Sequence, residues 1–408
     1  MVSKYPSKKA LTLFTSLIFQ KTTSFPAKYT IFTKSTKARR LFMSTVNTMV
    51  NDEATTVSTK KGPLIGLGMA ALGRPGYINL NRETMGVGTA SDRSVNHMKT
   101  LAEKVMQCVL DTANTESSTN TATPKAWFDC ARSYGKSEEF VGSFLRSKSI
   151  EPSDVYVSSK WGYEYVADWN VSLEPGKPHE IKNHSVEMFL KQLEETKHHI
   201  GEYIDLYQIH SATFESGVLT NSDVHEALHQ CRVDLGWDIG LSVSSPKQNE
   251  TLLEAMELKV KNGQRLFDSV QCTYNLLEQK PANALMEAHN AGMDIIIKEG
   301  MANGRLWNHS ALKKMCQTVQ SLSDFTTSDS DDIITPDQLA LGAILAQPFQ
   351  PRVLSGAVTC AQFKSNYKAL KVANLFKTKY PDLLQQLMQE CVMESNEYWD
   401  QRSALKWN

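Results

Sequence analysis

The sequence of 408 residues lacks an excess of charge of either sign, since Lys and Arg number 44 and Asp and Glu also number 44. This balance gives no indication of a nucleic-acid or membrane-surface partner, both of which attract strongly basic proteins. Apolar residues make up 41% and charged residues 22% of the chain, as in an ordinary soluble globular protein. We therefore expect a folded body whose partners are neither nucleic acids nor membranes.

The sequence also lacks a CxxC pair, and its cysteines do not cluster. An odd number of cysteines spread over a large chain predicts reduced thiols, not a disulfide framework. Cys130, beside Asp129, is expected to be a small packing residue and not a redox sensor. The seven cysteines are Cys108, Cys130, Cys231, Cys272, Cys316, Cys360 and Cys391.

Residues 1–51 contain no acidic residue, although they contain nine basic ones, and the first carboxylate is Asp52. A basic, Ser/Thr-rich and acid-free start is typical of an organelle transit peptide. A secretory signal with its apolar segment at 11–19 and a disordered basic tail are the alternatives, and that segment is too short to span a bilayer. We expect a targeting presequence at 1–51, disordered or removed, that leads to a plastid or mitochondrion, with the cytoplasm as the fallback.

Three apolar, strand-like segments in the middle of the chain each end on a polar side chain. These residues are Asp129, Lys160 and His210, and Tyr134 follows Asp129 by five residues. The carboxyl ends of the strands of a parallel α/β barrel form one mouth, where active sites are built. The four side chains are therefore expected to meet at such a mouth.

Beyond Gly62, strand-like and helix-like segments alternate with short turns. This rhythm predicts one (β/α)8 TIM barrel over residues 52–408, with extended loops at the carboxyl face of the strands and a C-terminal helix at 383–402. Polar stretches at 112–124 and 323–332 interrupt the alternation. The expected strands are 126–129, 155–160, 204–210, 237–242, 267–274, 293–298 and 352–356, and the expected helices are 136–148, 184–200, 221–235, one ending at 256, 281–292 and 337–347.

The segment 161–182 is far longer than a usual connection between a strand and a helix. It contains the aromatic residues Trp161, Tyr163, Tyr165 and Trp169. Aromatic side chains on a long loop at a barrel mouth commonly form substrate walls. We expect a substrate loop that favours a flat or apolar substrate, with a self-packed surface loop as the alternative.

The segment Phe128-Asp-Cys-Ala-Arg-Ser-Tyr-Gly-Lys-Ser-Glu138 resembles the first signature of the aldo-keto reductases. Ser-Ser-Lys160 and Gln-Ile-His210 follow in that family's order, and the likeness extends over about residues 63–370. The resemblance implies a barrel that binds a nicotinamide cofactor without a Rossmann domain. It also implies reversible reduction of an aldehyde or ketone to an alcohol, by an oxidoreductase that acts on the CH–OH group.

The chemistry of this reaction explains the four residues. Hydride addition to a carbonyl leaves an alkoxide that must be protonated, and a tyrosine with a pKa near 10 is a weak acid unless a cation favours its phenolate. Lys160 is the expected cation, Asp129 holds this lysine, and His210 orients the substrate oxygen. Tyr134 is then the proton donor in reduction and the base in oxidation.

The resemblance also implies a cofactor site. Ser242 and Gln271 are expected to bind the nicotinamide carboxamide, and Asn366 is expected to lie near the adenine. Lys298 stands where a tyrosine often stacks on the nicotinamide ring.

Two positions that usually grip the 2′-phosphate of NADP have lost their basic residues, because Gly356 and Gln362 stand there. Each lost charge-assisted hydrogen bond removes about 1.5–3 kcal/mol of interaction. NADP(H) is the default of the resembled family, and NAD(H) is the alternative. Lys364 and Lys368 are the candidates that could compensate.

Two other motifs imitate unrelated families. His225-Glu-Ala-Leu-His229 matches the HExxH pattern of zinc peptidases, but it is expected on an outer helix of the barrel, and we expect no metal. Gly66-Leu-Gly-Met-Ala-Ala71 imitates a dinucleotide fingerprint, but Pro75 stops the helix that should begin there. We expect this segment to form a hairpin at the barrel floor.

A barrel of this kind could instead be a catalytically weak, cofactor-binding regulatory or scaffold subunit. The loss of the phosphate-binding residues and the presence of Lys298 favour that alternative, while the intact set of four favours catalysis. We expect an enzyme that acts on a small-molecule carbonyl as a monomer or a small homo-oligomer.

Overall fold

The computed structural model describes residues 62–116, 126–325 and 333–408. The predicted presequence at 1–51 lies outside these residues. Residues 117–124 and 326–332 of the two predicted polar stretches also lie outside them.

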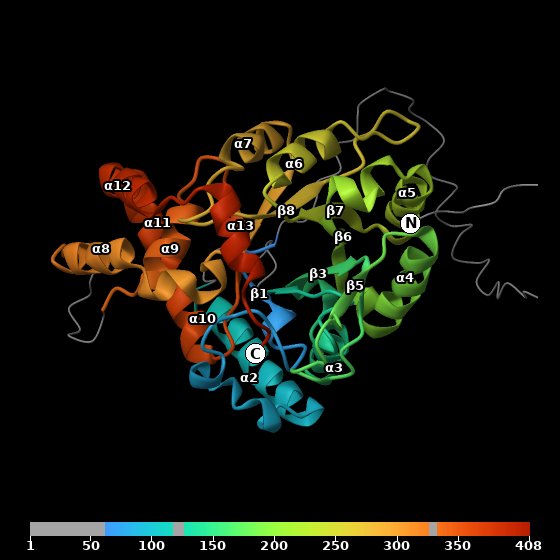
Figure 1. Cartoon of the computed structure of the whole chain (residues 1–408), viewed down its shortest axis with the longest axis horizontal. Helices are drawn as coiled ribbons and strands as arrows, with labels where there is room; N and C mark the ends of the chain where they lie inside the picture. The colour runs from blue at the N-terminus through green and yellow to red at the C-terminus, as the bar shows by residue number, and fades with distance from the viewer. Residues whose placement is uncertain (1–61, 117–125, 326–332) are drawn as a thin grey trace, which may run out of the picture. The chain divides into compact units, whose positions relative to one another are not determined.

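Eight parallel strands close into a barrel in which β1 pairs with both β2 and β10 (Figure 1). The predicted (β/α)8 barrel is therefore confirmed. The strands, in their order around the barrel, are β1 (Ile65–Gly68), β2 (Ala126–Asp129), β3 (Val155–Trp161), β6 (Ile204–Ala212), β7 (Asp238–Val243), β8 (Ser269–Thr273), β9 (Asp294–Lys298) and β10 (Arg352–Ser355).

The strands are buried on both faces, as in other parallel sheets covered by helices. Every residue of β3 is buried, and so is every residue of β8. One close approach requires glycine: a Cβ on Gly66 would lie 2.3 Å from the ring of Trp127. The tightness of this packing fixes β1 against its neighbour β2.

The helices surround the strands and turn their apolar side chains inward (Figure 1). Ser185 caps the first turn of α4 by accepting a hydrogen bond from the Met188 amide at 3.2 Å, as its position predicts. The helices are α2 (Val95–Glu116), α3 (Ser137–Ser147), α4 (Val186–Ile200), α5 (Ser222–Leu235), α6 (Gln248–Met256), α7 (Ala282–Asn290), α8 (Ser310–Gln320), α9 (Pro336–Leu345), α10 (Cys360–Tyr367), α11 (Ala369–Thr378), α12 (Pro381–Cys391) and α13 (Ser395–Ser403).

Two predictions about the ends of the barrel are wrong. The segment Gly66 to Ala71 forms no hairpin at the floor, because Ile65–Gly68 is the first barrel strand and a short 3-10 turn follows it. The single C-terminal helix expected at 383–402 is divided into α12 and α13. Val392 takes an extended backbone conformation and Glu394 caps the second helix.

The prediction that all cysteines are reduced is also wrong. Cys108 on α2 and Cys360 at the start of α10 form a disulfide, although 252 positions separate them in the sequence. The other five thiols are free, and Cys130 is buried.

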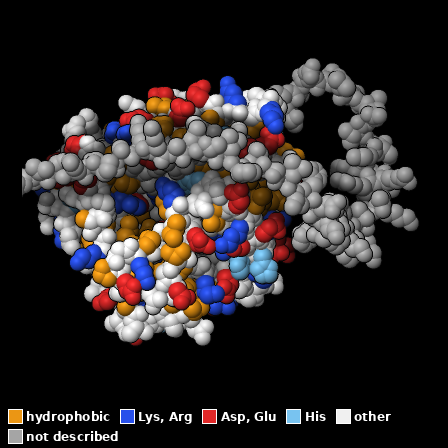
Figure 2. Space-filling model, turned by 45° about the vertical axis from the view of Figure 1, so that its right-hand side comes forward, with side chains coloured by type: hydrophobic (Ala, Val, Ile, Leu, Met, Phe, Trp, Pro, Cys, Tyr) orange, Lys and Arg blue, Asp and Glu red, His pale blue; other side chains and the backbone are white. Residues whose placement is uncertain are grey.

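Basic and acidic side chains are interspersed on the face of the molecule shown in Figure 2. This distribution agrees with the even charge count of the sequence. Within the described ranges, every helix is too short or too polar to cross a membrane.

Candidate active site

The structure brings the four predicted catalytic residues together. Asp129, Lys160 and His210 lie at or near the carboxyl ends of β2, β3 and β6, and Tyr134 lies in the turn after β2. The Nζ atom of Lys160 is 2.5 Å from Asp129 Oδ2 and 5.0 Å from the centroid of the Tyr134 ring. The rings of Tyr134 and His210 meet edge to face, with their centroids 5.4 Å apart.

The pair of Asp129 and Lys160 is buried and held by further hydrogen bonds. Lys160 also donates to the carbonyl of Cys130 at 2.9 Å. Asp129 Oδ1 accepts from Ser158 Oγ at 2.7 Å and from Gln271 Nε2 at 3.2 Å. A buried ion pair is stable only when such bonds satisfy its remaining polar atoms, so this lysine is held as a fixed cation.

Burial sets the protonation of the other two residues. It raises the pKa of Tyr134 well above the usual value, and the charge of Asp129 adds to this effect. It lowers the pKa of His210 well below the usual value, and the charges of Lys160 and Lys298 add to that effect. Tyr134 is therefore a protonated phenol and His210 a neutral imidazole, so each can donate a hydrogen bond to a carbonyl oxygen.

A cavity of about 750 Å³ opens beside these residues, within the range of ligand sites in proteins. Of the residues predicted from the sequence to be functional, those that line it are Asp129, Tyr134, Gln271, Lys298, Gly356, Gln362 and Asn366. Lys160, His210 and Ser242 stand behind its wall and do not line it. One cavity thus joins the predicted catalytic and cofactor residues.

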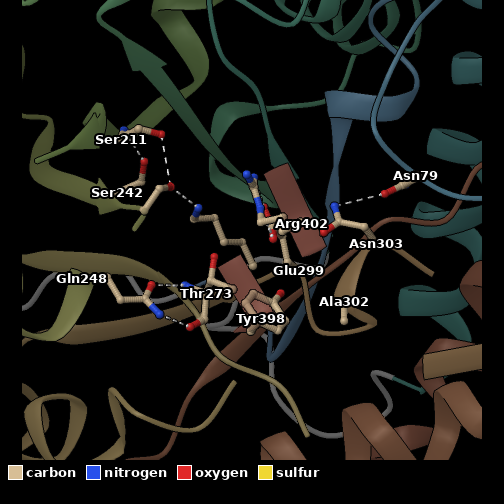
Figure 3. A network of polar contacts seen from close by, with 12 residues as sticks. Asn79, Ser211, Ser242, Gln248, Thr273, Glu299, Ala302, Asn303, Tyr398 and Arg402 are labelled. Carbon is tan, nitrogen blue, oxygen red and sulfur yellow. Dashed lines mark hydrogen bonds and ion pairs between the residues drawn. The ribbon is translucent and has the colours of Figure 1, made fainter. Parts of the chain in front are cut away.

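At the catalytic end of the cavity, polar side chains fix one another. Ser242 Oγ accepts from the amide of Ser211 at 2.8 Å, and Lys298 Nζ donates to Ser244 Oγ at 2.7 Å (Figure 3). Burial lowers the pKa of Lys298 to about 8. The cation that replaces the expected aromatic ring therefore carries its charge only weakly at neutral pH.

At the far end of the cavity, the predicted adenosine-binding residues form a second network. Asn366 accepts from Ser355 Oγ at 2.7 Å and donates to Asp337 Oδ2 at 2.7 Å. Gln362 Oε1 accepts from the Val358 amide at 2.8 Å. Gly356 is exposed, and its side-chain position is open space.

The predicted substrate loop does not wall the cavity. Trp161 is the last residue of β3, with its side chain fully buried against Phe189, so its assignment to the loop is wrong. Within the loop, β4 (Tyr163–Tyr165) and β5 (Glu180–Lys182) form a small antiparallel sheet. Tyr163 and Tyr165 lie on β4, and the ring of Tyr163 packs on that of His210 with centroids 5.0 Å apart.

Trp169 instead supports the base of the loop. Its Nε1 donates to the carbonyl of Arg93 at 2.9 Å, and its ring lies edge-on to Phe140. The aromatic residues of this loop therefore pack largely on the protein itself, which favours the self-packed alternative for Trp169.

Sequence reasoning missed Arg74, a buried guanidinium beside Tyr134. Its Cζ atom lies 5.1 Å from the centroid of the Tyr134 ring, and it donates to the carbonyl of Ser133 at 2.8 Å and pairs with Glu180. Arg74 follows β1 closely. Had Ile65–Gly68 been read as a barrel strand, the position of this arginine near the barrel mouth would have indicated it.

A second missed group is the pair formed by Glu299 and Arg402 (Figure 3). Arg402 on α13 donates from Nε to Glu299 Oε2 at 2.8 Å and from Nη2 to Oε1 at 2.5 Å. Glu299 lines the cavity directly after β9. A pairing over 103 positions leaves no local pattern in the sequence that could have found it.

The HExxH motif lies on α5, as expected, away from these residues. His225 Nε2 is 2.8 Å from the carbonyl of Val218, where it makes a local hydrogen bond. Across the described ranges, no group of three or more potential metal ligands comes together.

A (β/α)8 barrel with a paired lysine, a tyrosine and a neutral histidine at the carboxyl ends of its strands defines a barrel enzyme whose chemistry lies at that end. A profile of the aldo/keto reductase family matches residues 65–385. The chain belongs to this family, whose members bind nicotinamide cofactors and act on small-molecule carbonyl compounds.

Solved structures show the same fold. The aldo-keto reductase AKR11C1 from Bacillus halodurans, in its holo form, is 19% identical with a TM-score of 0.52, and the match covers 81% of this chain and 94% of that one. The thermostable aldo-keto reductase Tm1743, with epalrestat bound, is 18% identical with a TM-score of 0.49, over 84% and 99% of the two chains. A variant of Gox0644 with NADPH is 15% identical with a TM-score of 0.49, over 82% and 91%. No curated protein sequence matches the chain.

Proposed function

We propose that the protein reversibly reduces an aldehyde or ketone to an alcohol with a nicotinamide cofactor, and that Tyr134 donates the proton. The observation that carries this proposal is the position of Tyr134. It lines the cavity within 5.0 Å of the Lys160 cation and in edge contact with the neutral ring of His210. The resulting activity is that of an oxidoreductase acting on the CH–OH group.

The described residues fit a nicotinamide cofactor, because a single cavity joins Tyr134 to Asn366 and carries polar side chains at both ends. Gln271 and Lys298 would hold it at the catalytic end, and Gln362 and Asn366 at the other. When bound, such a cofactor supplies or accepts the hydride.

The protein's own residues then handle the substrate oxygen and its proton. His210, neutral because its burial lowers its pKa, donates a hydrogen bond that orients the carbonyl. Tyr134 releases its proton to the oxygen as negative charge develops there. The phenolate formed in this way faces the cation of Lys160, which Asp129 holds in place. In the oxidation direction the same phenolate is the base.

The test is the substitution Tyr134→Phe, with kcat measured over a panel of aldehydes and ketones and cofactor affinity measured by fluorescence. We expect kcat to fall by about 10²–10⁴, the usual contribution of a general acid, while cofactor affinity is retained. Tyr163→Phe is the matched control, since it removes a phenol that also packs on His210. Unchanged turnover by Tyr134→Phe would show that another group donates the proton.

The same panel separates the alternative of a regulatory or scaffold subunit. Tight cofactor binding by the unmodified chain, without turnover of any carbonyl compound or alcohol, would favour that alternative. Lys298 is the observation behind it, because a lysine replaces the aromatic ring expected against the nicotinamide.

A further inference from the structure

The far end of the cavity, opposite Tyr134, carries no positive side chain among the described residues that line it. Lys298 is the one lysine or arginine in the whole described lining, and it belongs to the catalytic end, where its charge acts on His210. Both Lys364 and Lys368 are exposed on or beside α10 and do not line the cavity. Neither of them therefore replaces the lost phosphate-binding residues.

A carboxylate stands at this end instead. Asp337, in the first turn of α9, lines the cavity and is only 5% exposed. Its Oδ2 atom accepts the hydrogen bond from Asn366, but its buried Oδ1 atom has no partner among the described residues. A buried acceptor without a donor is unfavourable, so this oxygen is available to a donor on a ligand.

The other polar groups of this end are neutral and mostly engaged. Gln362 holds the Val358 amide, and Ser365 Oγ lies 3.3 Å from Gln338 Nε2. Gly356 has open space where a side chain would be. The site thus offers a ligand one carboxylate acceptor and no cation from the described residues.

We propose that this end of the cavity selects NAD(H) over NADP(H), with Asp337 as the residue that determines the selectivity. A hydroxyl of the adenosine ribose can donate to the free carboxylate oxygen, as acidic residues do in other NAD sites. A 2′-phosphate would instead bring further negative charge to a buried carboxylate without a cation to offset it. The proposal rests on the proposed function, because it assigns the adenosine half of the cofactor to this end.

The experiment is a fluorescence titration of the purified full-length chain with NADH and NADPH separately. Trp307 lines the cavity and provides an intrinsic reporter. We expect NADH to bind roughly 10- to 100-fold more tightly, the range for a single charge-assisted hydrogen bond. Tighter binding of NADPH would overturn the selectivity while leaving the oxidoreductase assignment intact, whereas binding of neither would overturn both.

Variants identify the residue responsible. Asp337→Asn should weaken NADH binding and strengthen NADPH binding, so that the ratio of the two Kd values moves towards one. The control is Asp382→Asn, which removes an exposed carboxylate on α12 and should leave both Kd values unchanged. If Asp337→Asn does not fold, Gly356→Lys puts a cation into open space and should raise NADPH affinity alone. An unchanged ratio in a folded Asp337→Asn protein would contradict the role of Asp337.

Discussion

Tyr134 lies between two positively charged side chains, and only one of them belongs to the four residues predicted from the sequence. Lys160 is 5.0 Å from the Tyr134 ring but shares its charge with Asp129. Arg74 is 5.1 Å from the same ring, and its charge lowers the pKa of Tyr134 while burial and Asp129 raise it. Arg74 therefore offers a second stabilisation for the phenolate.

Substituting Arg74→Met should lower the oxidation rate and move its pH dependence. Oxidation needs the phenolate as base, and loss of a cation that lowers the pKa of Tyr134 shifts phenolate formation to higher pH. We expect the rise of kcat with pH to move to higher pH, and kcat at neutral pH to fall on the order of tenfold.

The pH–rate profile of alcohol oxidation measures this effect, with Arg74→Lys as the control that keeps the charge. If Arg74→Met loses stability but its pH profile is unchanged, Arg74 only supports the fold. Arg74 also faces Tyr77 and Trp407, at 5.0 and 4.6 Å, so the stability of each variant must be measured in parallel.

At the scale of elements, the ion pair of Glu299 and Arg402 fastens α13 to the end of β9. The pair holds Glu299 in a left-handed backbone conformation, with φ of 57°, that non-glycine residues seldom adopt. Arg402 lowers the pKa of Glu299 to about 2, against the effect of burial. A helix at the C-terminus thus positions a residue of the cavity wall.

Substituting Arg402→Met should destabilise the protein by about 3–5 kcal/mol at pH 7, because it leaves a buried carboxylate unpaired. In the unmodified protein the depressed pKa of Glu299 stabilises the fold above about pH 4.5, and this contribution is lost as the pH falls towards 2. Arg402→Met should therefore lose this acid-dependent component. Urea unfolding between pH 3 and 7 measures it.

The double variant Arg402→Met/Glu299→Gln provides the control for the pair. It should recover part of the lost stability, because it removes the unpaired charge as well as its partner. Additive losses in the single variants would mean that the two side chains do not stabilise each other.

How much of these elements could be predicted depends on the length of each pattern. Seven strands follow apolar runs that the sequence displays clearly, but β1 has only four residues, two of them glycine, so it resembled a turn. The division between α12 and α13 was missed because no proline or glycine stands between Val392 and Glu394. The catalytic residues follow their strands and were placed in advance, whereas Arg74, Glu299 and Asp337 depend on contacts between distant segments.

At the scale of the whole molecule, the disulfide between Cys108 and Cys360 joins α2, early in the barrel, to α10, directly after its last strand. It lies beside Ala361 and Gln362, which line the far end of the cavity. Replacing Cys108→Ser should cost about 2–4 kcal/mol of unfolding free energy in the absence of reductant. A strong reductant should lower the unmodified protein to the same stability and leave the variant unchanged. Equal stability of both proteins under oxidising conditions would mean that the bond does not contribute.

The predicted presequence would determine where this molecule works, and its removal would change the charge of the protein. We propose that residues 1–51 direct the chain to a plastid or mitochondrion, because they carry nine basic and no acidic residues. Removing them leaves 44 − 9 = 35 basic residues against 44 acidic ones, so the mature protein should migrate as an acidic species. A fluorescent fusion to residues 1–61 should enter the organelle, and the protein isolated there should begin near residue 52. Replacing the nine basic residues with glutamine should leave the fusion in the cytoplasm, and organelle entry of that variant would contradict the proposal.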